Sequence, residues 1–338
     1  MLQGKQSWVF ENTPVITAAG TAGGPFEAEG RLTSDFDYFF DDLWMEEKSF
    51  EKAQKRLFEK ACETAITKSG LKESDIQFVL CGDLINQMTS SSFACRTLSI
   101  PYIGLFGACS TSMEGLALAG FIINNNGADY VLTGTSSHNA ATEKQFRYPT
   151  EYGSQKPPTS QWTATAAGAV IVSKNGTGPS VTAATVGKVI DMGLKDPFNM
   201  GGAMAPAAAD TIEAHFNDLN RGPDDYDLII TGDLGKVGNS ICQELLKEKG
   251  YQVSEKKFND CGMLLYNEDQ PVQAGASGTG CSASVVYGHI LNRLKNRELN
   301  KILVVATGAL LSPLSYQQKE SIPCIAHAVV IENKGEVR

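Results

Sequence analysis

The sequence predicts an α/β protein made of two duplicated halves, each of the βαβαβαββ type around a central mixed sheet. Three observations carry this prediction: four stretches recur in the same order, the strand-like stretches are continuously apolar, and amphipathic helical stretches separate them. Continuous apolar runs indicate strands buried on both faces, which requires helices on both sides of the sheet.

The four recurring stretches are a strand ending in Gly-Asp-Leu, a small-residue turn into a helix, a second strand, and a closing strand with a polar turn. They pair as 78–84 with 228–234, 107–112 with 280–284, 130–136 with 303–309, and 167–176 with 326–335. Four matches in one order indicate an internal duplication. A turn-rich break at 175–179 separates the copies, so we predict halves of 1–178 and 179–338.

Two further segments give the halves their expected outline. Apolar residues at three- and four-residue spacings predict an amphipathic helix over Phe50–Ser69. The segment from His138 to Trp162 has no counterpart in the second half and contains three prolines, so we do not expect a single regular element there. Long loops inside a compact domain are usually functional or mobile, and this loop belongs to the predicted first half.

Composition excludes several classes of protein. The chain has 338 residues, with 42% hydrophobic and 20% charged, as in soluble globular proteins of two domains. A formal net charge of -9 argues against nucleic-acid binding. We expect neither a secretory signal peptide nor a transmembrane helix, because no apolar stretch has the required pattern. The eight cysteines lack zinc-site spacing and are expected to be reduced.

Cys109 lies at a turn between a predicted strand and a predicted helix. The strand-like run 103–106 leads through Gly107 and Ala108 into a helix that begins near Ser110. Backbone N–H groups and the helix dipole favour a thiolate at such a position, which is typical of a nucleophile. A cysteine among small residues is equally typical of an inert core thiol. The residues alone leave both interpretations open.

The run from Gly107 to Glu114 resembles the nucleophile turn of thiolases and ketoacyl synthases. Longer runs resemble the stage V sporulation protein AD family of spore-forming bacteria, and they span nearly the whole chain. These runs are 106–113, 136–140, 145–153, 203–210 and 319–327.

This resemblance implies a thiolase-like fold and a spore protein that binds dipicolinic acid (pyridine-2,6-dicarboxylic acid), free or as its calcium chelate. It further implies that the protein helps move this ligand into the developing spore. The implied location is the inner spore membrane, with peripheral attachment and with the other subunits of a dipicolinate channel as partners. A homodimer follows by analogy with thiolases.

The other residues that a condensing enzyme of this superfamily needs are missing. In the resembling enzymes a histidine and a further histidine or asparagine activate the thiol and hold the thioester oxygen. Here 231–235 has no histidine, 275–281 has no asparagine, and 306–311 has no second cysteine. We therefore predict a protein that is not an enzyme and has no cofactor, with Cys109 as a vestigial nucleophile. The alternative is a condensing or acyl-transfer enzyme that pairs Cys109 with His138 or His327.

A planar dianion requires Arg or hydroxyl donors, N–H groups at a helix start, and apolar faces. The candidates are polar residues at the Cys109 turn and near predicted strand ends. They are Cys109, Ser110, Asp83, Asn86, Ser136, Ser137, His138, Arg147 and His327.

Two of these assignments have direct rivals. Arg147 offers a guanidinium group next to aromatic residues, but it is equally suited to pair with Glu143 or Glu151 in the same loop. Asp83 and Asp233 occupy matching places in the two Gly-Asp-Leu runs, which favours structural roles. If the ligand is the calcium chelate, either aspartate is a possible metal contact. His215 and His289 are expected on helix faces.

Overall fold

The computed structural model describes residues 1–146 and 156–333. Its strands form a mixed sheet that runs through both halves, in the order β12-β11-β14-β15-β10-β3-β9-β7-β5-β6. The first-half strands are β3 (Val15–Gly23), β5 (Phe78–Gly82), β6 (Tyr102–Gly104), β7 (Tyr130–Ser137) and β9 (Ala166–Ser173). The second-half strands are β10 (Ser180–Val186), β11 (Leu228–Thr231), β12 (Phe258–Asp260), β14 (Lys301–Ala309) and β15 (Cys324–Glu332).

The two halves repeat one pairing scheme. In the first half β3 pairs antiparallel with β9, β9 antiparallel with β7, and β7 and β6 parallel with β5. In the second half β10, β15, β14, β11 and β12 pair in the same sequence with the same directions. The predicted duplicated α/β fold is confirmed. β10 meets the first half twice: it pairs with β3 at Ser180 opposite Val15, and it pairs antiparallel with β2 (Ser7–Val9). The boundary at 178 stays a prediction.

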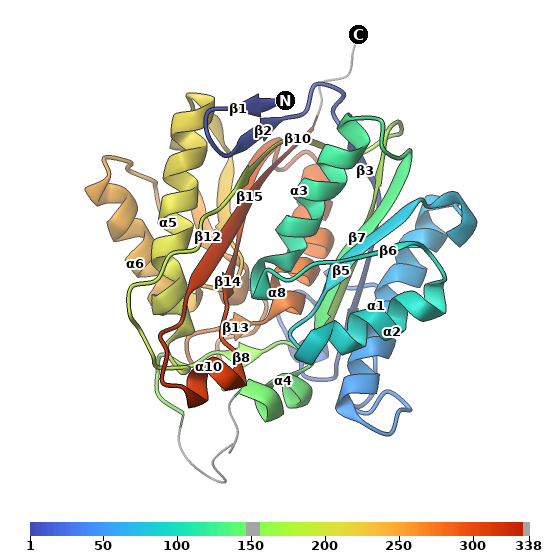
Figure 1. Cartoon of the computed structure of the whole chain (residues 1–338), viewed down its shortest axis with the longest axis horizontal. Helices are drawn as coiled ribbons and strands as arrows, with labels where there is room; N and C mark the ends of the chain where they lie inside the picture. Colours follow the sequence, from blue (N-terminus) through green and yellow to red (C-terminus); the bar gives the residue numbers. More distant parts are fainter. Residues whose placement is uncertain (147–155, 334–338) are drawn as a thin grey trace.

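Helices lie on both faces of the strands, as the continuous apolar runs predicted (Figure 1). The outer helices are α1 (Phe50–Ser69) and α2 (Thr89–Leu98) in the first half, and α5 (Met200–Leu219) and α6 (Gly235–Glu248) in the second. The helix predicted over Phe50–Ser69 is confirmed; the Ser49 hydroxyl caps its start and Gly70 ends it in a left-handed conformation. Two helices, α3 (Thr111–Asn124) and α8 (Thr279–Ser284), lie between the strands of the first half and those of the second.

Small residues let the central helices approach the strands closely. A Cβ atom on Gly115 of α3 would lie 2.2 Å from the Thr133 hydroxyl of β7. Similarly, a Cβ atom on Gly280 of α8 would lie 2.0 Å from the Ala166 carbonyl of β9. Both helices are therefore packed tightly enough to fix the residues at their N-terminal ends. Helix α8 continues as a π-helix, η7 (Val285–Ile290), and then as α9 (Leu291–Lys295).

The remaining elements are short and connect the main ones. The strands are β1 (Leu2–Gln3), β2 (Ser7–Val9), β4 (Tyr38–Phe39), β8 (Trp162–Thr163) and β13 (Ala276–Ser277). The α-helices are α4 (Asn139–Phe146), α7 (Cys261–Leu264) and α10 (Pro313–Gln317). The 3-10 turns are η1 (Glu27–Glu29), η2 (Thr33–Asp35), η3 (Glu73–Asp75), η4 (Asn86–Met88), η5 (Ala108–Ser110) and η6 (Pro223–Asp225).

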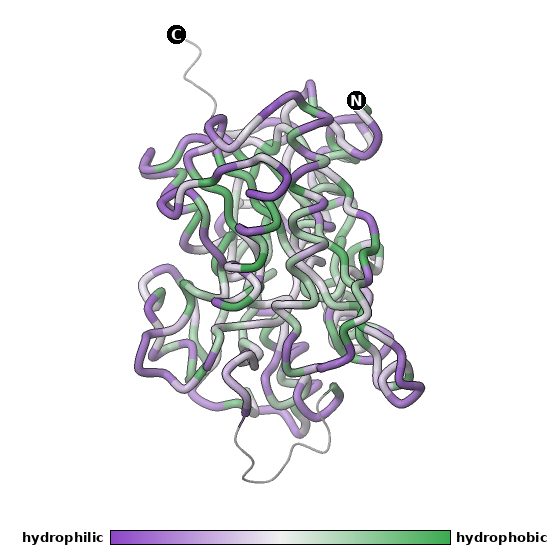
Figure 2. Tube along the Cα trace, turned by 90° about the vertical axis from the view of Figure 1, so that its left-hand side faces the viewer, coloured by the Kyte–Doolittle hydropathy of each residue, from purple (hydrophilic) through white to green (hydrophobic). Residues whose placement is uncertain are grey.

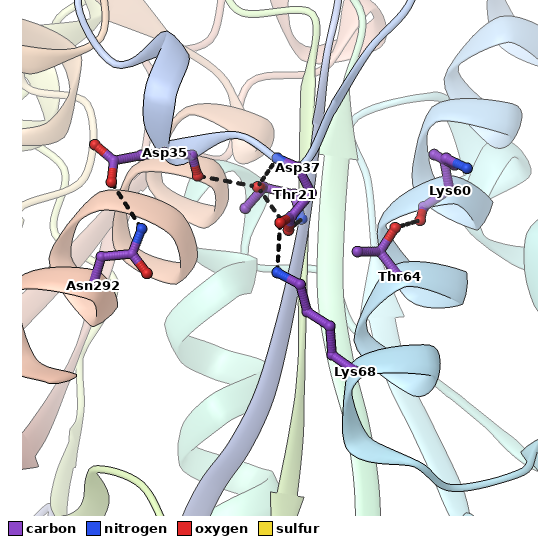
Figure 3. Close-up of polar contacts among 7 residues, drawn as sticks. All are labelled: Thr21, Asp35, Asp37, Lys60, Thr64, Lys68 and Asn292. Atoms are coloured by element: carbon purple, nitrogen blue, oxygen red, sulfur yellow. Dashed lines mark hydrogen bonds and ion pairs between the residues drawn. The ribbon is translucent and has the colours of Figure 1, made fainter.

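A polar strap, residues 34–37, ties the first half to the second. The Asp35 carboxylate accepts hydrogen bonds from Asn292 Nδ2 of α9 at 2.8 Å and contacts His289 Nδ1 at 2.8 Å. Asp37 forms an ion pair with Lys68 near the end of α1. Figure 3 shows the two aspartates pointing toward partners on opposite sides of the strap.

Hydrophilic residues are concentrated in the peripheral loops and near the ends of the chain (Figure 2). The interior strands and central helices carry the hydrophobic residues, which form the largest core cluster around α3, η7 and the facing strands. Within the described ranges, every helix is too short or too polar to cross a membrane.

Candidate functional site

The turn that carries Cys109 is held between the two halves. Ala108 has a positive φ of 49°, and the Ser110 N–H donates to the Gly107 carbonyl at 3.0 Å, so the chain reverses sharply before α3. Gly308 of β14 packs against this turn, where a Cβ atom would lie 2.1 Å from the Gly107 carbonyl oxygen. The second half thus packs directly against the turn, which holds Cys109 at the start of a central helix.

Cys109 lines a small cavity of about 30 Å³. Its other lining residues come from both halves: Leu84, Phe106, Ala108, Thr142, Phe146, Thr163, Met200, Ser277, Ala309 and Leu311. The volume corresponds to the space occupied by about one water molecule, and the walls are mainly apolar. The Thr142 hydroxyl is buried there without a hydrogen-bond partner, so one polar group of the cavity remains unsatisfied.

Asp233 is the polar centre of the site. Its carboxylate accepts hydrogen bonds from the Thr307 hydroxyl at 2.9 Å, the Ser277 hydroxyl at 3.2 Å and the Gly278 N–H at 3.0 Å. The Cys109 thiol lies near enough to act on the same carboxyl. Burial raises the pKa of the Asp233 carboxyl, and the hydrogen bonds from Cys109 and Thr307 act against that rise. The cysteine therefore faces a carboxyl group on β11's C-terminal extension.

Sequence reasoning missed this contact. It treated Asp233 as the structural counterpart of Asp83 because both end a Gly-Asp-Leu run. The available signal was the place of Asp233 just after the strand where the resembling condensing enzymes carry histidine. In this chain a carboxyl group occupies that region and reaches the cysteine.

The hydroxyl groups next to Cys109 stabilise the turn itself. Ser110 Oγ donates to the Gly107 carbonyl at 2.6 Å, and Thr111 Oγ1 donates to the Ala108 carbonyl at 2.7 Å. Both residues are fully buried. Their donor hydrogens are engaged, and the predicted role of Ser110 in ligand binding stays a prediction.

Ser136 and Ser137 hold the start of α8 against β7. The Ser136 carbonyl accepts from Thr279 Oγ1 at 2.6 Å, whereas the Ser136 hydroxyl is buried without a partner. Ser137 Oγ donates to the Ala164 carbonyl at 2.7 Å and accepts from the Gly280 N–H at 3.1 Å. These contacts lie beside the cavity, but neither serine lines it.

The two histidine candidates lie in other surroundings. His138 is buried, contacts the Leu43 carbonyl through Nε2 at 2.8 Å and stacks on Phe50, and burial lowers its pKa. His327 accepts from the Gly187 N–H at 3.3 Å, and burial lowers its pKa to about 4. Both are therefore neutral at pH 7, and neither lines the Cys109 cavity.

The remaining candidates are Asp83, Asn86 and Arg147. The Asp83 carboxylate accepts from the N–H groups of Ile85 and Ser91, both at 2.7 Å, and thereby fixes the chain leading into α2. Asn86 is exposed, and its N–H donates to Gln145 Oε1 at 3.0 Å. Arg147 lies outside the described residues, as does part of the predicted 138–162 loop; the described start of that loop is helix α4.

Neither aspartate offers calcium a free carboxylate oxygen. Both oxygens of Asp83 and both oxygens of Asp233 accept hydrogen bonds from the protein. Across the described ranges, no three histidine, cysteine or acidic side chains are grouped to hold a metal ion.

The duplicated halves, the paired central helices and the cysteine turn between them define a thiolase-like α/β protein. Solved structures with this fold align over most of the chain. Human mitochondrial 3-ketoacyl-CoA thiolase matches with a TM-score of 0.60 and 12% identity over 96% of this chain and 100% of that one. The 3-oxoacyl-[acyl-carrier-protein] synthase III of Aquifex aeolicus VF5 gives 0.55 and 12% over 95% and 100%. Cerulenin-bound OleA of Xanthomonas campestri gives 0.58 and 14% over 98% and 100%.

A closer relationship defines the family. Residues 4–332 match the family described as Stage V sporulation protein AD (SpoVAD). The stage V sporulation protein AD of Bacillus subtilis (strain 168) is 53% identical over 334 residues, covering 99% of this chain and 98% of that protein. The chain belongs to the stage V sporulation protein AD family.

Proposed function

We propose that this sporulation protein binds dipicolinate, free or as its calcium chelate, without catalysing a reaction, and serves the uptake of dipicolinate into the developing spore. The observation that carries the non-catalytic part is the place of the Cys109 thiol beside the buried Asp233 carboxyl, where the thiol acts on the pKa of that carboxyl. The choice of dipicolinate as the ligand rests on the resemblance described in the sequence analysis.

The Asp233 carboxylate is a poor activating group for a thiol. An ordinary carboxylate is a far weaker base than a thiolate, and although burial raises the pKa of Asp233, hydrogen bonds from Thr307, Ser277 and Gly278 act against that rise. A thiolate beside a charged carboxylate would also place two negative charges in one buried site. The relatives with condensing activity need a histidine to avoid this problem. The arrangement favours a thiol that binds or packs over one that attacks.

We place the dipicolinate site at the Cys109 cavity, with one structural requirement. A cavity of about 30 Å³ does not accept a pyridine ring with two carboxylates, so the wall must move. Phe146 is the best candidate because it ends α4 and lies against Leu84 and Cys109. Its displacement would bring the unsatisfied Thr142 hydroxyl to the ligand.

Calorimetry with dipicolinate tests this proposal. We expect saturable binding to the wild type that weakens at least about tenfold in Arg147→Ala, because a charge-assisted hydrogen bond contributes about 1.5–3 kcal/mol. Cys109→Ala is expected to weaken it as well. Arg297→Ala removes an exposed arginine far along the chain and serves as the control for charge. Absence of binding at millimolar dipicolinate would overturn the proposal.

The competing function, acyl transfer through Cys109, makes a separate prediction. An acyl-transfer enzyme would carry a covalent thioester on Cys109 after incubation with acetyl-CoA. Mass spectrometry of the intact protein and of the peptide containing Cys109 detects such an adduct. We expect none, and a stoichiometric adduct would replace the binding function with the enzymatic one.

We further propose a homodimer formed through β6. This strand is at the end of the sheet and pairs only with β5 among the described strands. Ile103 and Phe106 are 41% and 52% exposed there, so an apolar edge with free backbone groups is available to a second copy. Light scattering should report a dimer that Ile103→Lys dissociates. A monomeric wild type would refute this assignment.

Attachment to the inner spore membrane is the last part of the proposal. We infer that other subunits of a dipicolinate channel hold the protein there. Co-purification of the chain with membrane proteins from sporulating cells tests this, and recovery of the chain solely in the membrane-free fraction would contradict it.

A further inference from the structure

A groove separate from the Cys109 cavity lies between α1 and α2 on the outer layer of the first half, where the two helices run side by side (Figure 1). Its volume is about 480 Å³. Its lining comes from the loop before α1, the first turns of α1, and α2: Glu47, Ser49, Glu51, Lys52, Lys55, Thr89, Ser90, Phe93 and Arg96. We call it the α1–α2 groove.

Positive charge is in excess in this groove. Lys55 is neutralised by Glu59 at 2.8 Å, and Glu51 is neutralised by Lys144 at 2.9 Å. Lys52 and Arg96 form no ion pair with any residue that the structure describes. Two uncompensated cations in one groove are notable in a chain whose net charge is -9. The single remaining carboxylate of the lining, Glu47, does not balance them.

The groove also has an aromatic surface. Phe93 is 46% exposed, although it is a large apolar residue in the middle of α2. The Arg96 guanidinium lies over the Phe93 ring, 4.6 Å from its centre. This stacking holds the guanidinium in place and leaves the rest of the ring open to a second flat group. A cation and an aromatic face are thus presented together.

Size separates this groove from the Cys109 cavity. Sites for small molecules usually measure about 300–1,000 Å³. The α1–α2 groove, at about 480 Å³, falls within this range without any side-chain movement, whereas the Cys109 cavity measures about 30 Å³. A flat anion can therefore enter the groove in the described conformation.

We propose that the α1–α2 groove binds planar aromatic carboxylates. The ring packs on the exposed part of Phe93, one carboxylate accepts a forked pair of hydrogen bonds from Arg96, and Lys52 neutralises the second. The identification of dipicolinate as one such ligand rests on the proposed function. The groove then holds dipicolinate at the surface, apart from the cavity.

The experiment compares two ligands and two charge-matched variants by calorimetry. The ligands are dipicolinate and benzene-1,3-dicarboxylate, which has the same carboxylate spacing without the ring nitrogen. The groove variant is Lys52→Ala/Arg96→Ala. The control is Lys256→Ala/Arg297→Ala, which removes the same charge at exposed positions outside the groove. We expect the groove variant to lose at least about tenfold in affinity for benzene-1,3-dicarboxylate and to lose the groove's share of dipicolinate binding, while the control stays within about twofold for both ligands.

The outcomes distinguish this inference from the proposed function. If the groove variant binds both ligands as tightly as the wild type, the groove assignment is wrong, whichever residues carry the binding. If the wild type binds benzene-1,3-dicarboxylate in a groove-dependent way but not dipicolinate, the groove assignment holds and the proposed function fails. Phe93→Leu adds a check on stacking, because it keeps the apolar surface and should still weaken both ligands several-fold.

Discussion

Replacing Asp233 with Asn tests the contact on which the non-catalytic interpretation depends. Asparagine has nearly the same shape, carries no charge and keeps one acceptor oxygen. The side chain it replaces is fully buried, accepts hydrogen bonds from Ser277, Gly278 and Thr307, and lies near the Cys109 thiol. An amide NH₂ must therefore face donors on one side of the site.

The magnitude follows from those donors. If the amide nitrogen takes the place of Oδ2, the Gly278 N–H loses its acceptor, and an unsatisfied buried donor costs about 1–3 kcal/mol. Hydroxyl groups can rotate away, so Ser277 adds less. Removing the negative charge also makes a thiolate at Cys109 less unfavourable, because like charges no longer share the site. We expect a loss of about 2 kcal/mol in the free energy of unfolding and at least about tenfold faster alkylation of Cys109.

Asp83→Asn is the matched control for both measurements. Asp83 is equally buried, sits at the same place in the duplicated run, and accepts two backbone N–H groups, but it does not line the Cys109 cavity. Urea unfolding gives the stability of each variant, and mass spectrometry after timed iodoacetamide treatment gives the alkylation rate at Cys109. Equal acceleration in both variants would mean that loosened packing, and not the lost charge, exposes the thiol, and the reasoning would fail.

Three further predictions concern stability. Burial raises the pKa of Glu27 from 4.5 to about 7, so the protonated side chain stabilises the fold at low pH and this stabilisation is lost as pH rises through about 4.5–7. In urea unfolding, Glu27→Gln should abolish about 3 kcal/mol of this pH dependence. An unchanged profile would exclude Glu27 as its source. Asp35→Ala removes the acceptor of Asn292 and should lower the free energy of unfolding by about 1.5–3 kcal/mol, whereas a loss below about 0.5 kcal/mol would show that the strap contributes little. Gly308→Ala places a Cβ atom 2.1 Å from the Gly107 carbonyl and should cost about 1–3 kcal/mol in thermal or urea unfolding; a neutral effect would show that the Cys109 turn is free to shift.

Much of the fold could be predicted because its signals are local and repeated. Strands that are buried on both faces have continuously apolar sequences, and the duplication repeats this pattern in both halves. The pairing of β3 with β10 was not predictable, because it depends on a contact between distant segments at Val15 and Ser180. Helix α5 begins at Met200 and contains Pro206, a residue that the sequence alone does not favour inside a helix. Packing of its alanine-rich face outweighs the hydrogen bond that the proline cannot make.

The candidate site was predictable at Cys109 and less so around it. A turn of small residues between a strand and a helix identifies the cysteine from its neighbours alone. The side chains that contact Cys109 depend on how the two halves pack together, and the spacing of residues along the sequence does not reveal that packing. Polar residues near strand ends were natural candidates, yet Ser137 and His138 satisfy backbone groups of other segments. Buried polar side chains must find partners, so position near a strand end does not separate ligand donors from structural ones.

The duplication explains how Asp233 became available to Cys109. In the first half, Asp83 fixes the chain after its strand by accepting two backbone N–H groups. In the second half Asp260 of β12 performs this task, accepting the N–H groups of Leu234 at 2.8 Å and Gly235 at 2.9 Å. Because Asp260 accepts the N–H groups at the start of α6, the Asp233 carboxylate is not needed there and can face the cysteine. Two residues that are equivalent in sequence thus have different roles, because a third carboxylate from a neighbouring strand satisfies the helix start in only one of the halves.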